Sequence, residues 1–149
     1  MGKRGEGWFL LQMVLFAVIF FTPAIAPFRF PIELRVLGGV ILLIGGGLGT
    51  AGLFSLGSNL SPFPKPIENG RLVTGGAYRL VRHPIYAGLI LGTLGWGLLM
   101  ATLLGVAFAI VLFIFFDLKS RREEVWLTQK YPGYAEYQRQ VRKLIPGIY

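Results

Sequence analysis

One stretch near the middle of the chain, residues 70–88, gathers most of the residue types that bind polar ligands. It reads GRLVTGGAYRLVRHPIYAG and contains three arginines, the only histidine and two tyrosines: Arg71, Arg79, Arg82, His83, Tyr78 and Tyr86. Guanidinium and imidazole groups donate charge-assisted hydrogen bonds to anions, and tyrosine rings offer π-faces to cations. Because long apolar regions lie on both sides, this density of donors predicts a ligand site at the edge of a membrane rather than a simple connection.

The composition excludes several other kinds of site. The chain has no cysteine and one histidine, which excludes disulfides, cysteine nucleophiles and metal sites built from several histidines or cysteines. Its formal net charge is +8, from 15 Lys and Arg against 7 Asp and Glu. We interpret this charge as basic loops beside anionic lipid headgroups rather than as a nucleic-acid surface. The sequence therefore predicts no metal and no nucleic-acid partner.

The elements that position this stretch are predicted to be membrane helices. Hydrophobic residues make up 54% of the chain, charged residues 15%, and the mean hydropathy is +0.61. Residues 8–26 and 36–56 form two apolar runs, each close to the roughly 20 residues that cross a bilayer. Ala24-Ile25-Ala26 also has the small-x-small form of a signal-peptide cleavage site. Pro27 follows directly and the apolar run is long, so we favour a first membrane helix that ends within residues 23–31.

A third apolar region is too long for one crossing. Residues 85–116 include no charge over 32 positions, which as a single helix would measure about 48 Å against a hydrocarbon core of about 30 Å. We predict a hairpin of two helices, 85–100 and 103–130, with its break between Met100 and Gly105. Small residues four apart, Gly88 and Gly92, would let the two arms of the hairpin pack closely. Gly45 and Gly49 would serve a similar packing role in the second helix.

The charges set the predicted topology. With four crossings, every lysine and arginine except Arg29 and Arg35 lies on one side, which the positive-inside rule makes cytoplasmic. The chain then continues into the cytosol, breaks at Pro132-Gly133 and forms a short helix over 134–143. Its aromatic residues have two open interpretations, an interfacial belt or the walls of a pocket: Trp126, Tyr131, Tyr134 and Tyr137. We expect one all-α membrane domain over residues 1–149, with both termini cytoplasmic, in the cell inner membrane of a prokaryote or the endoplasmic reticulum of a eukaryote.

Several short patterns occur together in a recognisable order. The sequence RHPIYAG is followed, one predicted hairpin later, by REE, YPGYAEY and LIP. In this order and separation the chain, from residue 56 to 149, resembles the isoprenylcysteine carboxyl methyltransferase and phospholipid methyltransferase superfamily of integral membrane enzymes. The resemblance implies methyl transfer from S-adenosylmethionine to a lipophilic acceptor that partitions into the membrane. It also implies a cytosolic pocket roofed by the C-terminal segment, with the lipid entering from the bilayer.

The resemblance assigns candidate binding residues for this cofactor. Arg82 or His83 would bind its carboxylate, and Glu123 or Glu124 its ammonium or ribose hydroxyls. Tyr78 and Tyr86 would face the sulfonium or the adenine. A helix that begins at Pro84 would present free N–H groups there, and Gly88 would let the ligand approach the backbone. Neighbours in a helix cannot share one direction, so we expect one glutamate in the site and one in solvent, with Glu124 preferred in the site.

Three residues are predicted to act on the acceptor. A carboxylate acceptor is ionised at pH 7 and needs no base, whereas an amine or a phenol needs one, for which Glu124 is the candidate. Arg122 and Arg139 are candidates for steering an anionic head group. No metal is required, since the methyl group is already activated by its sulfonium.

Two other functions stay open at this point. A reductase that uses a nicotinamide dinucleotide is one alternative, because sterol reductases look like distant relatives of this chain that share its membrane architecture. The chain has no GxGxxG motif after a strand, but the dinucleotide pocket of those reductases is not a Rossmann site, so the missing motif does not exclude this function. A non-enzymatic membrane scaffold is the other alternative. The acceptor and the oligomeric state are not specified by the sequence.

Overall fold

The chain folds into helices joined by short turns and one long polar loop. The computed structural model describes residues 5–21 and 28–149, and helices are its only regular secondary structure over these two ranges. They are α1 (Glu6–Phe21), α2 (Ile32–Leu56), the 3₁₀ helices η1 (Gly57–Asn59) and η2 (Gly76–Arg79), α3 (Pro84–Leu99), α4 (Leu103–Lys130) and α5 (Tyr134–Gln140). The all-α prediction is confirmed for the described residues. The candidate cleavage site Ala24–Ala26 and the predicted end of the first helix lie partly or wholly outside them.

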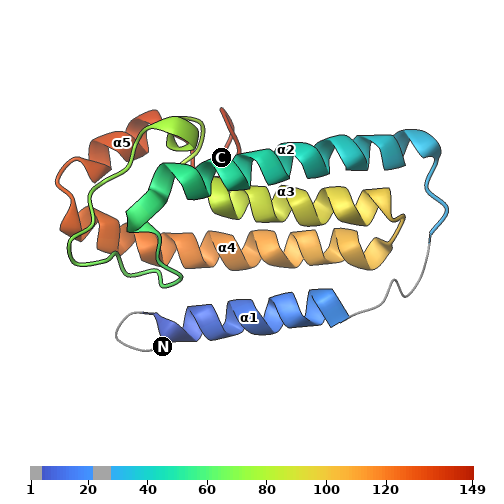
Figure 1. The fold of residues 1–149 in the computed structure, drawn as a ribbon, viewed down its shortest axis with the longest axis horizontal. Helices are drawn as coiled ribbons and strands as arrows, with labels where there is room; N and C mark the ends of the chain where they lie inside the picture. Colours follow the sequence, from blue (N-terminus) through green and yellow to red (C-terminus); the bar gives the residue numbers. More distant parts are fainter. Residues whose placement is uncertain (1–4, 22–27) are drawn as a thin grey trace.

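Four long helices lie side by side and run alternately in opposite directions (Figure 1). Contacts join α2 to α3, α3 to α4, and α1 to α4. As a result, the loop between α2 and α3, the start of α1, the end of α4 and α5 all lie at one end of the bundle (Figure 1). The polar segments that the sequence places far apart thus meet in one region.

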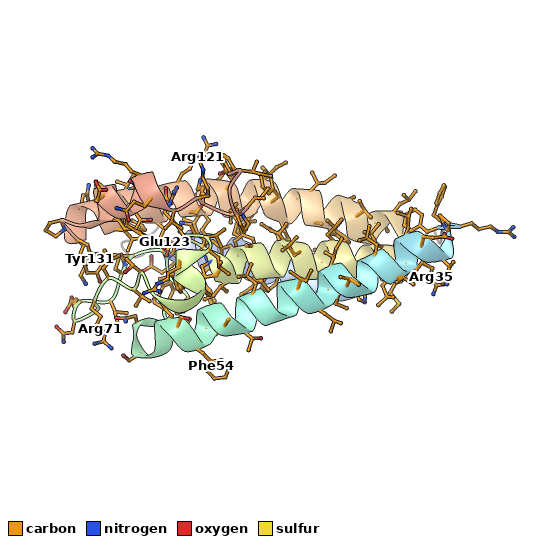
Figure 2. All side chains as sticks on the ribbon, turned by 90° about the horizontal axis from the view of Figure 1, so that it is seen from above. Arg35, Phe54, Arg71, Arg121, Glu123 and Tyr131 are labelled. Carbon is orange, nitrogen blue, oxygen red and sulfur yellow. The ribbon has the colours of Figure 1, made fainter. Side chains whose placement is uncertain are left out.

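The outer surface of the bundle is largely apolar. Two of the described helices are long and apolar enough to cross a membrane, Ile32–Asn59 and Leu103–Lys130, and two shorter apolar helices are Glu6–Ile19 and Pro84–Leu99. Large apolar side chains point away from the bundle, and on α2 Leu43 is 77% and Phe54 83% exposed (Figure 2). Such a surface is poorly suited to water, and a hydrocarbon environment would remove this penalty.

Glycines bring α2 and α3 into backbone contact. A Cβ atom at Gly45 would lie 2.6 Å from the Gly92 nitrogen, and one at Gly95 would lie 2.3 Å from the Leu42 nitrogen. A Cβ at Gly88 would lie 2.6 Å from the Gly49 Cα atom. The missing side chain of Gly88 therefore faces α2 rather than a ligand, which differs from the predicted role of this residue.

The turn between α3 and α4 is tight. Met100–Thr102 connects the helices, with Ala101 at a φ of 52°, in agreement with the predicted break. The close approach of the two arms involves Gly97 and Gly105: a Cβ at Gly97 would lie 2.6 Å from the Gly105 carbonyl carbon. The sequence predicted Gly88 and Gly92 for this contact, but Gly88 faces the other neighbour, α2.

After α5 the chain turns back onto the start of α3. Two backbone hydrogen bonds fix it there, from Arg82 N to Arg142 O at 2.8 Å and from His83 N to Lys143 O at 3.1 Å. The Lys143 ammonium also donates to Asp117 Oδ1 of α4 at 2.7 Å. The predicted last helix, 134–143, is therefore shorter than expected, because residues after Gln140 pair with the loop before α3 instead of continuing the helix.

Candidate functional site

A cavity of about 320 Å³ lies at the end of the bundle where the polar segments meet. Its walls come from the loop after α2, the first turns of α3, the last turns of α4, and α5, with one residue, Gln12, from α1. This volume is within the range of pockets that bind small molecules and cofactors. Of the residues predicted to bind a cofactor, the cavity is lined by five: Tyr78, Arg82, His83, Tyr86 and Glu123.

Tyr86 is fixed in one orientation by three contacts. Its ring stacks on Phe116 at 4.5 Å and on His83 at 5.3 Å between centroids, the latter with an interplanar angle of 3°. Its hydroxyl donates to Glu123 Oε2 at 2.8 Å. The wall therefore presents an aromatic ring next to a carboxylate, an arrangement that attracts cations.

Glu124 is enclosed in a separate cluster. Its Oε1 accepts from Arg82 Nε at 2.8 Å and lies 3.1 Å from His83 Nε2, while its Oε2 accepts from Gln138 Nε2 at 3.0 Å. The Arg82 guanidinium also donates to the backbone carbonyls of Gln138, at 3.2 Å, and of Val141. Donors on both oxygens favour the ionised carboxylate. The cluster joins the loop before α3, the end of α4 and the C-terminal segment.

The two glutamates are arranged differently from the prediction of one in the site and one in solvent. Glu123 lines the cavity, whereas Glu124 does not and points to α5, and their side chains are only 23% and 12% exposed. Both are partly buried because α3 and the C-terminal segment cover two adjacent sides of the end of α4. It is Glu123, not the preferred Glu124, that lines the cavity.

His83 lies between the two carboxylates. Its Nδ1 is 4.0 Å from Glu123 Oε2, and its Nε2 contacts Glu124. The residue is 6% exposed. His83 thus connects the cavity wall to the enclosed cluster around Glu124.

The remaining predicted residues lie outside the cavity wall. Pro84 is buried at the first position of α3, where a residue without an N–H is well accommodated. Arg122 is exposed and its guanidinium carbon lies 5.0 Å from the centre of the Trp126 ring. Arg139 has a 79% exposed side chain that pairs with Glu136 at 3.3 Å. Neither arginine lines the cavity.

Comparison with known proteins identifies the family of this chain. A family model described as phospholipid methyltransferase matches residues 34–133, from the first turn of α2 to the residue before α5. The chain belongs to the phospholipid methyltransferase family. The resemblance read from the sequence is thereby confirmed, and the matched region of this family member includes Tyr78, Arg82, Glu123 and Glu124.

Several curated relatives are similar to this family member. It is 31% identical to protein-S-isoprenylcysteine O-methyltransferase A of Arabidopsis thaliana over 115 residues, which cover 74% of the chain and 58% of the relative. It is 30% identical to human protein-S-isoprenylcysteine O-methyltransferase, covering 77% of the chain and 42% of the relative. The cobalt-zinc-cadmium resistance protein CzcN of Cupriavidus metallidurans is 35% identical, with 54% and 38% covered. The chain spans about half the length of the curated relatives it matches.

Sequence reasoning missed one charged residue of the cavity wall. Lys119 lines the cavity and is only 2% exposed. Its position, four residues before Glu123 in one helix, was the available signal, because residues four apart share a helix face. Gln12 was also missed, since it stands alone in an apolar run and belongs to a part of the chain before the matched family region.

The C-terminal tyrosines belong to the pocket rather than to a belt. Tyr131, Tyr134 and Tyr137 line the cavity, whereas Trp126 does not. Tyr137 donates from its hydroxyl to the Tyr78 carbonyl at 2.6 Å. Tyr134 is 2% exposed, and its buried hydroxyl has no hydrogen-bond partner among the described residues. Burial raises the pKa of the Tyr134 hydroxyl above its usual range, so this group stays neutral.

Proposed function

We propose that this protein is a methyltransferase that uses S-adenosylmethionine to methylate a lipophilic acceptor within a membrane. Membership of the phospholipid methyltransferase family supports the reaction class, and the names of the plant and human relatives support an acceptor that carries a lipid. Apolar residues of the cavity wall, among them Leu56, Ile85 and Leu89, support binding of a lipophilic acceptor. The observation that carries the proposal is the cavity wall in which Glu123 stands beside the ring of Tyr86.

The residues of the cavity fit this methyl donor. S-adenosylmethionine has two cationic groups, the ammonium and the sulfonium, and Glu123 provides a carboxylate for one of them beside the ring of Tyr86. Its ribose and adenine carry polar atoms, and the unpartnered hydroxyl of Tyr134 would gain a hydrogen bond from such a group. Tyr78 and Tyr131 would contribute two further aromatic rings to the wall of the same pocket. His83 would orient the wall through its contacts with both glutamates.

The proposed catalysis depends on positioning rather than on a strong base. When bound, S-adenosylmethionine supplies a methyl group already activated by the positive sulfur. The chain aligns the acceptor with that group and excludes water. These two effects can supply a large part of the lowering of the activation barrier. Glu124 would be a weak base, because Arg82 and His83 stabilise its ionised form and it does not line the cavity. This arrangement favours an acceptor that is already ionised, such as a carboxylate.

We also propose that α1, α2, α3 and α4 all cross the membrane, with the cavity end in the cytosol. The described basic residues support this orientation: Arg71 and Arg121 lie toward the end that carries Glu123 and Tyr131, whereas Arg35 lies at the opposite end (Figure 2). The positive-inside rule then makes the cavity end cytoplasmic. This membrane would be the inner membrane of a prokaryotic cell or the endoplasmic reticulum of a eukaryotic one.

Calorimetric titration of the detergent-purified protein tests the proposed reaction class. We expect micromolar binding of S-adenosylmethionine and of its demethylated product, S-adenosylhomocysteine, and no binding of reduced nicotinamide adenine dinucleotide phosphate. Binding of the nicotinamide compound alone would identify a reductase. Binding of none of the three would support a scaffold without enzymatic activity.

A further inference from the structure

A buried lysine on the cavity wall has no carboxylate partner. Lys119 of α4 is 2% exposed. Its ammonium donates to Gln12 Oε1 of α1 at 2.5 Å and lies 5.2 Å from the centre of the Tyr86 ring. Ion pairs within 4.0 Å join other residues of the described chain, and none of them includes Lys119. A buried charge that is only partly compensated is costly, and such residues in membrane proteins mark functional sites.

Lys119 stands one helical turn from Glu123. Residues four apart lie about 6 Å apart along the helix axis and on one face, and both side chains line the cavity. The two opposite charges nevertheless contact neutral groups: Lys119 the amide of Gln12, and Glu123 the hydroxyl of Tyr86. The ring of Tyr86 is held by Phe116 and His83 and contacts both charged residues. The wall therefore presents a cation and an anion that are separated by a fixed aromatic ring.

We infer that Lys119 and Glu123 together bind a zwitterionic group, with its anion at Lys119 and its cation at Glu123. Lys119 then gains the counter-charge that it lacks in the protein, and Glu123 gains a cation closer than His83 Nδ1, which lies 4.0 Å away. Two molecules with such a group can reach this cavity: the methyl donor, through its α-amino acid end, and a phospholipid, through a phosphate and amine head. The inference rests on the proposed function, which brings the methyl donor to this wall.

Gln12 makes this site possible because it is polar and neutral. Its carbonyl oxygen accepts a hydrogen bond from the Lys119 ammonium without cancelling the positive charge, and its amide nitrogen can itself donate to an anion. A carboxylate at the same position would form an ion pair with Lys119 and compete with the ligand. The identity of residue 12 therefore sets how strongly Lys119 attracts an anion.

The experiment compares two ligands that differ only in the amino-acid end. S-adenosylhomocysteine and 5′-methylthioadenosine share the adenosine and the sulfur, but the second lacks the ammonium and carboxylate. We expect wild-type protein to prefer S-adenosylhomocysteine in calorimetric titration. Lys119→Met and Gln12→Glu should each weaken S-adenosylhomocysteine about tenfold and leave 5′-methylthioadenosine unchanged, because one variant removes the cation and the other neutralises it. Lys65→Met, the control, should keep the preference, because Lys65 does not line this cavity.

A second titration distinguishes the two sources of the zwitterion. If Lys119→Met keeps the preference between the adenosine ligands but weakens binding of short-chain phosphatidylethanolamine, the zwitterion is the lipid head. If neither ligand binds more weakly to folded Lys119→Met and Gln12→Glu variants, the inference is wrong while the proposed function stands. If the wild-type protein binds no S-adenosylhomocysteine, the proposed function itself is wrong. Thermal unfolding of each variant reports whether it is folded.

Discussion

Two adjacent glutamates of α4 belong to regions with opposite properties. Around Glu124, the charged and polar side chains of three chain segments are hydrogen-bonded to one another, and both carboxylate oxygens are used. Around Glu123, the side chains line a cavity of about 320 Å³ and leave part of their bonding capacity open, as at Lys119 and at the Tyr134 hydroxyl. One residue step along the helix separates a hydrogen-bonded cross-link from the wall of a cavity.

The difference teaches that charge alone does not identify a binding residue. Glu124 has more charged neighbours, and this is why it cannot readily serve a ligand: a new partner would have to displace an existing one. Glu123 accepts one hydrogen bond, from the Tyr86 hydroxyl, lies 4.0 Å from His83 Nδ1 and lines the cavity. We therefore expect changes around Glu124 to lower stability and changes around Glu123 to lower ligand affinity.

The largest effect should follow from Glu124→Ala. The change leaves Arg82 and His83 without their shared acceptor and releases Gln138, so we expect the free energy of unfolding to fall by about 3 kcal/mol. Any loss of ligand binding should follow from this lower stability. Denaturant unfolding of the detergent-solubilised protein measures the change. A variant with wild-type stability but weak ligand binding would reverse the assignment of the two glutamates.

Glu123→Gln should act on affinity and spare stability. The amide oxygen can still accept from the Tyr86 hydroxyl, but the negative charge is lost. We expect S-adenosylhomocysteine to bind about 30-fold more weakly, since a charged hydrogen-bonded partner has been removed from its ammonium. The unfolding midpoint serves as the control. Equal affinity in the variant and the wild type would place the ammonium elsewhere.

Tyr134→Phe should have a smaller effect of the same kind. The hydroxyl has no protein partner among the described residues, so its removal should not lower stability. We expect about fivefold weaker binding of S-adenosylhomocysteine, the equivalent of one neutral hydrogen bond. Tyr137→Phe is the contrasting variant, because it removes the donor to the Tyr78 carbonyl and should lower stability instead. A Tyr134→Phe protein with unchanged affinity would mean that the hydroxyl does not meet this ligand.

The smallest effects should come from Arg122→Ala and Arg139→Ala. Both side chains are exposed, one over Trp126 and the other paired with Glu136 on the surface of α5. We expect stability within about 0.5 kcal/mol of wild type and unchanged binding of S-adenosylhomocysteine. A large loss of methylation by either variant, at unchanged stability, would restore the arginine as an acceptor-binding residue.

The helices were predictable because apolar run lengths and turn residues are local signals. The length of the uncharged region 85–116 required a hairpin, and the structure forms it with a turn at Met100–Thr102. The local sequence does not determine which neighbouring helix each glycine contacts. Gly88 contacts α2 rather than α4 because helix rotation is decided by the fit of whole surfaces.

The site was predictable only to the level of the segments that form it. The REE pattern identified the right turn of α4. Which glutamate faces the cavity depends on how α5 folds back onto α4, and the residues next to the two glutamates do not determine that packing. The same folding turned Arg82 toward Glu124 and the Gln138 carbonyl of α5. Lys119 and Gln12 come together from positions separated by 107 residues, and no local spacing connects them.

Helix α1 packs against α4 through Trp8, Leu15, Phe16 and Ile19 and contributes Gln12 to the cavity. It lies before the matched family region and takes no part in the cluster around Glu124. For protein engineering, α1 thus offers a position at which the cavity can be changed. Replacing Gln12 would alter what the cavity accepts while the hydrogen bonds that hold α3, α4 and α5 together stay in place.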